Sequence, residues 1–230
     1  MNNLNLIKDL PMTRLDKRIK MIGDLVPNEN FDLALSIQNE LLDYKADLDD
    51  FYQAVSVLKK QMETSKNYTD EYIAETIDSI LDENPPSLEI TINSDGGSAS
   101  DGFAIIDIIE ELKDVYKVVV NTHAIGSCLS MAVAVYMAGD VRTSGENTLF
   151  MLHQLSGGVR GSQNKLESKI TEMNIMTRQY KRMFKDAKIP EGALDRILSH
   201  DVDFYFDLDQ ARDWGIVNDQ ILEQNEQEIK

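Results

Sequence analysis

The sequence is poor in cysteine, in basic residues and in long apolar runs. Cys128 is the single cysteine, which excludes an intrachain disulfide framework and favours a reducing, cytoplasmic location. The 23 basic residues are outnumbered by 40 acidic ones, and the net charge of −17 would repel the phosphate backbone of a nucleic acid. The longest apolar run, 131–138, is too short to cross a membrane. The first residues also lack the pattern of a signal peptide.

Ligands for a metal or a nucleotide are also scarce. The spacings of the three histidines and the cysteine match no zinc site. Acidic residues crowd the 201–209 segment as they do in a calcium loop, but the glycine and the terminal glutamate of an EF-hand are missing. The turn at 95–98 could cradle a phosphate, yet no Gly-Lys-Ser/Thr follows it. We therefore expect no cofactor and no metal.

What the chain does contain is enough apolar sequence for one α/β domain spanning residues 1–230, since 42% of the residues are hydrophobic. The order strand, glycine turn, helix, strand occurs twice between residues 88 and 138, which favours parallel βαβ units. Strands are expected at 18–26, 88–92, 118–125 and 148–153, a turn at 27–30, and helices at 103–112, 130–138, 166–184, from Pro190, and at 208–214.

The N-terminal third of the chain is dominated by helical patterning. From Phe31 to Met62 the apolar residues keep three-and-four spacing, which predicts one long helix or two nearly continuous ones. Thr69 can cap a further helix, and Asn84-Pro85-Pro86 would stop it.

The segment 126–132, Gly-Ser-Cys-Leu-Ser-Met-Ala, joins a strand-like run to an apolar, helix-like run. A serine at the first turn of a buried helix lies beside unpaired amides, where the helix dipole also favours negative charge. An oxyanion formed beside Ser130 would therefore find donors already aimed at it. This arrangement favours acyl-transfer chemistry with Ser130 as the nucleophile.

A serine nucleophile needs a base, and the chain offers three histidines. His123 lies inside a strand, and His200 lies at a helix end where a solvated histidine is ordinary. His153 follows an apolar strand and precedes polar and glycine residues, at the strand edge where α/β proteins place functional side chains. His153 is thus the candidate base, with a structural role as the alternative. Spacing leaves the orienting carboxylate open among Asp201, Asp203, Asp207 and Asp209.

Five motifs occur in order between residues 93 and 217. They are Asn93-Ser-Asp-Gly-Gly97, Gly102-Phe-Ala-Ile-Ile-Asp107, Ser130-Met-Ala, Met151-Leu-His-Gln154 with Gly157-Gly158, and Ala211-Arg-Asp-Trp-Gly-Ile-Val217. Together they resemble the ClpP family, the proteolytic subunits of Clp serine proteases. One glycine pair would be weak evidence, whereas five collinear motifs are specific. The resemblance implies the ClpP/crotonase fold, a repeated ββα superhelix.

The resemblance also implies a set of site residues. Ser130 matches the nucleophile and His153 the general base. Asp203 matches the carboxylate that orients the base, because its distance to Trp214-Gly215 resembles the distance to a Tyr-Gly element in the family. The implied oxyanion donors are two backbone amides, those of Gly97 and Met131.

The same resemblance predicts an assembly and its partners. A strand-and-helix handle at about 154–187 would align an extended peptide and join two rings of a homo-oligomer. The substrates would be polypeptides, held as an added strand. An ATP-driven unfoldase is a possible partner, but Glu89 and Thr91 occupy positions where the family often carries tyrosines for that contact.

Three further departures from the family pattern bear on function. Asp95 stands where proline usually precedes the glycine pair, and Val202 stands where many members have an arginine that pairs across the ring interface. The segment of about 44–82 is longer than the family's link. We expect it to form an inserted helical hairpin that packs on the outside of the assembly or roofs its entrance, with a simple extension of the subunit core as the alternative.

These observations predict a serine endopeptidase that cleaves unfolded or extended polypeptides through an acyl-enzyme, inside a homo-oligomeric chamber. A catalytically impaired ClpP-like scaffold or regulatory subunit is the main alternative, because Asp95 or the insertion could spoil the triad. An acyl-CoA enzyme of the wider crotonase fold shares the glycine-turn logic, but the Ser, His and Asp set weighs against it.

Overall fold

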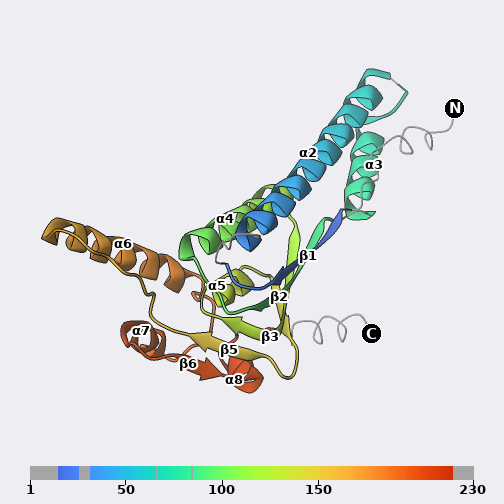
Figure 1. Ribbon diagram of the computed structural model, residues 1–230. Coiled ribbons are helices and arrows are strands. Elements are labelled where there is room, and N and C mark those ends of the chain that lie inside the picture. Colours follow the sequence, from blue (N-terminus) through green and yellow to red (C-terminus); the bar gives the residue numbers. More distant parts are fainter. Residues whose placement is uncertain (1–14, 26–31, 66, 84, 220–230) are drawn as a thin grey trace.

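The computed structural model describes residues 15–25, 32–65, 67–83 and 85–219 (Figure 1). In this part of the chain six strands form one mixed sheet in the order β1-β2-β3-β5-β6, with β4 also paired to β3. The strands are β1 (Asp16–Ile22), β2 (Ser87–Ser94), β3 (Val119–Leu129), β4 (Val141–Ser144), β5 (Leu149–Leu152) and β6 (Phe204–Phe206). The helices are α2 (Leu33–Ser65), α3 (Asp70–Glu83), α4 (Ala99–Tyr116), α5 (Met131–Met137), α6 (Gln163–Arg182), α7 (Ala193–Ser199) and α8 (Leu208–Asp213).

The predicted α/β class and the parallel βαβ arrangement are confirmed. The pairs β1/β2, β2/β3, β3/β4 and β3/β5 are all parallel, and only β6 runs antiparallel to its neighbour among the described strands. The helix α4 connects β2 to β3, and α5 connects β3 to β4, as a parallel sheet requires. The turn expected at 27–30 lies within residues 26–31, outside the described residues.

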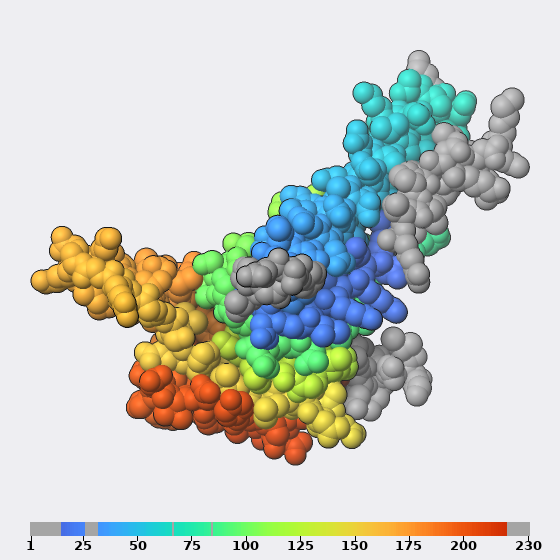
Figure 2. Space-filling model, viewed as in Figure 1, coloured from blue at the N-terminus to red at the C-terminus, as the bar shows by residue number. Residues whose placement is uncertain are grey.

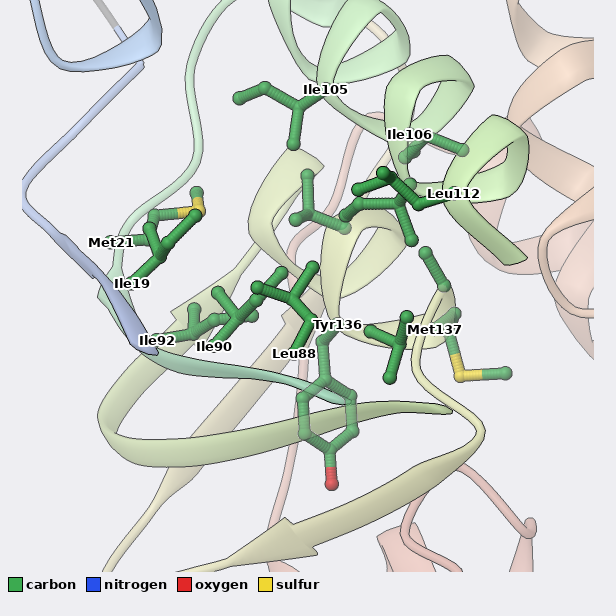
Figure 3. Packing of buried hydrophobic residues seen from close by; sticks show 14 of the residues in the cluster. Ile19, Met21, Leu88, Ile90, Ile92, Ile105, Ile106, Leu112, Tyr136 and Met137 are labelled. Carbon is green, nitrogen blue, oxygen red and sulfur yellow. The ribbon is translucent and has the colours of Figure 1, made fainter. Parts of the chain in front are cut away.

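The core lies where the central strands meet α4 and α5. Along β2, Leu88, Ile90 and Ile92 are buried at alternate positions, because successive side chains of a strand point to opposite faces. Figure 3 shows these side chains together with Ile105 and Leu112 of α4 in one apolar cluster. All seven residues of α5 are buried, so this short helix is held by packing on every side. It therefore gives the residues at its start a rigid support.

The third strand extends further than the sequence predicts. An irregularity in the β2/β3 pairing shifts the register, so that Ile92 lies opposite Ala124 but Ser94 lies opposite Cys128. Gly126 makes this possible, because it has φ +63 and an added Cβ would come within 2.8 Å of the Asn93 side-chain oxygen. After the irregularity the strand continues to Leu129 beside β5. This irregularity thus carries the chain into the turn that presents the candidate nucleophile.

Two helices, α2 and α3, occupy most of the segment in which the sequence predicts a hairpin. Of the two arrangements expected for the first part of this segment, the structure has one long helix, α2. At 33 residues it is about 50 Å long. Its first half packs against the body, where Tyr44 donates hydrogen bonds to the backbone oxygens of Leu15 and Ser87 at 2.6 and 3.1 Å. Thr69 caps α3 by accepting a hydrogen bond from the Tyr72 amide. The outer halves of both helices project from the body (Figures 1 and 2), and their role in an assembly stays a prediction.

A second projection is formed by α6, which is the helix of the predicted handle (Figure 1). Residues 153–161, which are all described, form no strand with any other described segment. A strand is stabilised by hydrogen bonds to a neighbouring strand, so the strand half of the handle stays a prediction that requires a peptide or a second copy. Among the described helices, none combines the length and the apolar character that a membrane crossing demands.

Candidate active site

The structure brings the predicted nucleophile and base into contact. Ser130 Oγ lies 2.6 Å from His153 Nε2, although 23 positions separate the two residues. Ser130 follows β3 and His153 follows β5, and these strands are paired in parallel with Leu129 opposite Met151. The two strand ends therefore meet at one edge of the sheet. The distance is that of a good hydrogen bond, short enough for proton transfer between the two groups.

The backbone of Ser130 adopts a conformation that few serines take. Its φ of 54° and ψ of −123° lie outside the regions favoured by residues with a side chain. Ser130 is the N-cap of α5, yet its hydroxyl makes no capping hydrogen bond, so the oxygen is left to His153. The Ser130 amide donates to the Met151 backbone oxygen at 2.9 Å. This sharp turn between a strand and a helix presents the hydroxyl in the way that a nucleophile elbow does.

Asp203 is the acid that approaches the base. Its Oδ1 lies 3.7 Å from His153 Nδ1, which is longer than a hydrogen bond, and its side chain is half exposed. A second contact at 3.4 Å comes from the hydroxyl of Tyr205. Asp207, another of the four candidates, is engaged elsewhere as the N-cap of α8. Asp203 is therefore placed to orient His153, but the contact is loose in this single chain.

The glycine pair lies directly against the turn that holds Ser130. Gly96 has φ +97, and an added Cβ would come within 2.8 Å of the Ser130 Cβ and the Met131 nitrogen. Gly97 has φ +132 and packs on the backbone of Leu25, with which it forms an isolated parallel bridge. Any side chain at these two positions would collide with backbone atoms, so the loop requires glycine there.

The predicted oxyanion donors are available. Among the described residues, neither the amide of Gly97 nor the amide of Met131 donates a hydrogen bond to the protein. Both belong to segments that touch at Gly96, and Met131 begins a helix, where the first amides lack partners within the helix. Two free donors beside a serine oxygen can stabilise the negative charge of a tetrahedral intermediate.

A cleft of about 430 Å³ opens beside this group, with α6 as one wall. Its apolar lining includes Met151, Leu155, Met173 and Met176, and the polar Gly97, Ser130 and His153 lie at the same cleft. Unbranched methionine side chains adapt to different apolar groups. The cleft is thus suited to an apolar side chain held next to the hydroxyl.

Charged groups mark the polar side of the cleft. Lys169 and Glu172 of α6 form an ion pair at 2.7 Å, and Asp95 lines the cleft beside the glycine pair. The Asp95 amide donates to Asp24 Oδ1 at 3.1 Å, a bond that a proline at this position could not make. The Asp95 amide therefore ties the turn to the segment after β1.

The two other histidines and the cysteine make contacts of the kind expected for residues with a structural role. His123 bonds the Thr143 hydroxyl at 2.7 Å, and His200 lies 2.6 Å from the Arg196 backbone oxygen. Cys128 is fully buried, and burial raises the pKa of its thiol, so it is a poor nucleophile. Within the described residues, no group of three or more His, Cys, Asp or Glu side chains could hold a metal ion.

Known proteins resemble this chain over most of its length. A model of the family described as Clp protease matches residues 46–225, well over half of the chain. This chain belongs to the Clp protease family. It is similar to the ATP-dependent Clp protease proteolytic subunit 2 of Bacillus licheniformis, with 30% identity over 142 residues that cover 60% of this chain and 70% of the relative. The mixed sheet and its helices are those of the ClpP fold, and the protein is a ClpP-like peptidase.

Two features of this Clp protease site were missed by sequence reasoning. One is the strand β6, whose three residues pair with β5 and bring Asp203 to His153. The other is Tyr180 of α6, which hydrogen-bonds the backbone oxygen of Ser130 at 2.8 Å. Tyr180 lies within the helix expected at 166–184. The sequence offered one signal for this contact, the tyrosine hydroxyl, because a buried tyrosine oxygen usually needs a hydrogen-bond partner.

Proposed function

We propose that this Clp protease is a serine endopeptidase that cleaves extended polypeptides through an acyl-enzyme. The observation that carries the proposal is the 2.6 Å contact between Ser130 Oγ and His153 Nε2 beside a cleft that is lined in part by methionine side chains. A serine hydroxyl is a weak nucleophile unless a base takes its proton, and this contact supplies the base.

Each residue has its own step in the proposed reaction. Ser130 Oγ forms a bond to the substrate carbonyl carbon while His153 Nε2 takes the hydroxyl proton. The carbonyl oxygen becomes negative and is stabilised by the amides of Gly97 and Met131. The C–N bond then breaks, and His153 returns the proton to the leaving amine. Water repeats the sequence on the ester, with His153 again as base, and releases Ser130.

Asp203 completes the triad in this proposal. Its carboxylate would accept a hydrogen bond from His153 Nδ1–H, hold the tautomer that leaves Nε2 free for the proton, and stabilise the imidazolium. The 3.7 Å separation must shorten for that bond to form. We propose that assembly of subunits closes it, because Asp203 is half exposed and is followed by the short strand β6. A permanently open contact would instead favour the impaired scaffold.

The substrate would bind as an added strand. Residues 153–161 have no strand partner among the described residues, and His153, Leu155 and Ser156 of this segment line the cleft, so their backbone groups are available to an extended peptide. Main-chain hydrogen bonds hold any sequence, and the methionine-lined cleft then selects an apolar side chain next to the scissile bond. Unfolded polypeptides would satisfy both requirements.

We further propose that the subunits form a cytoplasmic homo-oligomeric ring or double ring that encloses these sites. Membership of the Clp protease family supports this, and so do the exposed apolar residues Leu166, Ile170 and Ile175 on the projecting helix α6. The relative from Bacillus licheniformis is called ATP-dependent. Docking of an ATP-driven unfoldase on this chain is part of the proposal.

The experiment is covalent labelling of the assembled particle with a fluorophosphonate, which reacts with activated serines. We expect labelling at Ser130 in the wild type and none in Ser130→Ala, together with hydrolysis of an unfolded protein such as reduced, alkylated casein. Native mass measurement of the same sample gives the number of subunits. An assembled wild type without labelling or hydrolysis would reject the peptidase and favour the scaffold.

A further inference from the structure

Tyr180 connects the projecting helix α6 to the candidate nucleophile. Its hydroxyl donates a hydrogen bond to the backbone oxygen of Ser130, with 2.8 Å between the two oxygens. Tyr180 is 1% exposed and is the one buried residue of the twenty in α6, whose other end projects from the body (Figures 1 and 2). The one buried side chain of this helix is therefore hydrogen-bonded to the peptide group that follows the nucleophile.

That peptide group also carries an oxyanion donor. The C=O of Ser130 and the N–H of Met131 belong to one peptide unit, which is planar and rigid. A rotation that moves the oxygen of Ser130 must also turn the N–H of Met131. A bond from Tyr180 to the oxygen thus holds the direction of the amide that points at the site.

The peptide needs such a restraint because Ser130 is in an uncommon conformation. With φ 54° and ψ −123° it lies in a sparsely populated region that persists only where the surroundings hold it. The Met151 oxygen holds the Ser130 N–H on one side. On the other side two donors hold the Ser130 oxygen, the Val133 amide at 3.1 Å and the Tyr180 hydroxyl at 2.8 Å. Of these three hydrogen-bonding groups, two belong to the backbone and the third is the side chain of Tyr180.

A plainer reading is that Tyr180 merely needs an acceptor for a buried hydroxyl. Tyr44 shows what that role looks like elsewhere in the chain. It is also 1% exposed, and its hydroxyl donates to the backbone oxygens of Leu15 and Ser87 at the base of α2. Tyr44 is therefore a matched control, with the same chemistry at a place that holds no oxyanion donor.

We propose that Tyr180 is a positioning residue for the oxyanion hole, which acts by fixing the Ser130–Met131 peptide so that the Met131 N–H faces the developing oxyanion. The inference rests on the proposed serine-peptidase function. It adds a residue that touches neither the substrate nor the triad side chains. It also makes the packing of α6 a condition for transition-state stabilisation, since Tyr180 reaches the peptide only while the helix is docked.

The test compares Tyr180→Phe with Tyr44→Phe in the assembled enzyme. The readouts are steady-state kinetics on a short fluorogenic peptide with an apolar residue before the scissile amide, and binding of the matching peptide boronic acid. For Tyr180→Phe we expect kcat to fall about tenfold with KM within about twofold, because the lost interaction matters in the transition state. Affinity for the boronic acid, whose tetrahedral adduct occupies the oxyanion hole, should fall by a similar factor. Tyr44→Phe should change neither.

Further measurements separate the possible failures. 3-Fluorotyrosine at position 180 keeps the ring and the donor, so it should retain the wild-type kcat even if removal of the hydroxyl perturbs folding. Equal kinetics and boronate affinity for Tyr180→Phe and Tyr44→Phe would overturn the inference and leave the proposed function standing. A wild type without any turnover would overturn the proposed function itself. Crystal structures would then decide on Tyr180, since an unchanged Ser130–Met131 peptide in Tyr180→Phe contradicts its positioning role.

Discussion

Leu152 lies opposite Phe204 in the antiparallel pair of β5 and β6, and this pairing sets the next residue of one strand, His153, beside the preceding residue of the other, Asp203. His153 and Asp203 are therefore neighbours because of a strand of only three residues. The geometry of the proposed triad depends on a weak element at the edge of the sheet. Movement of β6 is the simplest way to tighten or loosen the His153 contact.

The first prediction concerns this contact. Asp203→Asn should lower kcat/KM by about 100-fold or more, because an amide can favour the wrong tautomer of His153 and cannot stabilise an imidazolium as a carboxylate does. KM should change little. Peptide hydrolysis by the assembled variant measures the effect, with Asp201→Asn as the control, since Asp201 is an exposed acid of the same segment. Wild-type kinetics for Asp203→Asn would remove Asp203 from the mechanism.

The second prediction concerns the glycine pair. Gly96→Ala adds a methyl group within 2.8 Å of Ser130 Cβ and the Met131 nitrogen, at a residue with φ +97. The loop must move, so we expect fluorophosphonate labelling of Ser130 to slow at least about tenfold and the free energy of unfolding to fall by about 1–3 kcal/mol.

Gly145→Ala is the control for Gly96→Ala. An added Cβ at Gly145 would meet its nearest neighbour at an ordinary 3.5 Å, and no positive φ is required there. This variant should label as fast as the wild type. Equal labelling of both variants would show that the loop has room for a side chain and that its glycine is not required for the site.

The sequence was sufficient to predict the parts of the site that local pattern controls. Ser130 lies at a turn between a strand and a helix, and His153 follows an apolar strand, whereas Gly97 and Met131 were expected as oxyanion donors from the resemblance to the ClpP family. Each signal is contained in a few consecutive residues. The parallel arrangement then brings the strand ends together, as the contact at Ser130 Oγ shows.

The remainder of the site depends on pairings between distant segments. Spacing alone left four nearby acids open, and only the resemblance to the ClpP family singled out Asp203. It is the register of β5 and β6 that places Asp203, rather than Asp207, next to His153. The strands β4 and β6 were not predicted, because four and three residues are too few to show a periodic pattern. The bond from Tyr180 to Ser130 spans 50 positions and follows only from the way that α6 docks.

The third prediction is a loss of stability at alkaline pH. Burial, assisted by a hydrogen bond to Asp49, raises the pKa of Tyr116 to about 12 from 10.0, and burial also raises the pKa of Tyr44. Above pH 10 the unfolded chain releases tyrosine protons that the folded chain still holds, so the free energy of unfolding should fall. The contribution of Tyr116 is complete below pH 10 and is lost as the pH approaches about 12.

Urea unfolding at several pH values between about 8 and 11 measures this loss. In Tyr116→Phe the free energy of unfolding should fall less steeply with pH than in the wild type, because one of the shifted groups is absent. Equal slopes for the two proteins would show that Tyr116 does not contribute to the linkage.

The fourth prediction separates the projecting hairpin from the catalytic site. The outer parts of α2 and α3 contain Met62 and Ile73, which are buried. In Figure 1 the tip where these two helices join projects away from β3, β5 and α5, the elements that flank Ser130 and His153. Replacing residues 60–76 by a short glycine-serine turn should leave fluorophosphonate labelling of Ser130 unchanged. The shortened chain keeps far more of the apolar core than it loses.

Native mass measurement of the shortened chain then decides between the roles considered for the hairpin. We expect the same number of subunits as in the full-length chain, because the proposal assigns the joining of rings to α6 and not to α2 and α3. Faster hydrolysis of an unfolded protein, with an unchanged rate on a short peptide, would indicate that the hairpin roofs the entrance, since only the larger substrate must pass it. Dissociation into single chains would contradict the expectation and would assign assembly to the hairpin.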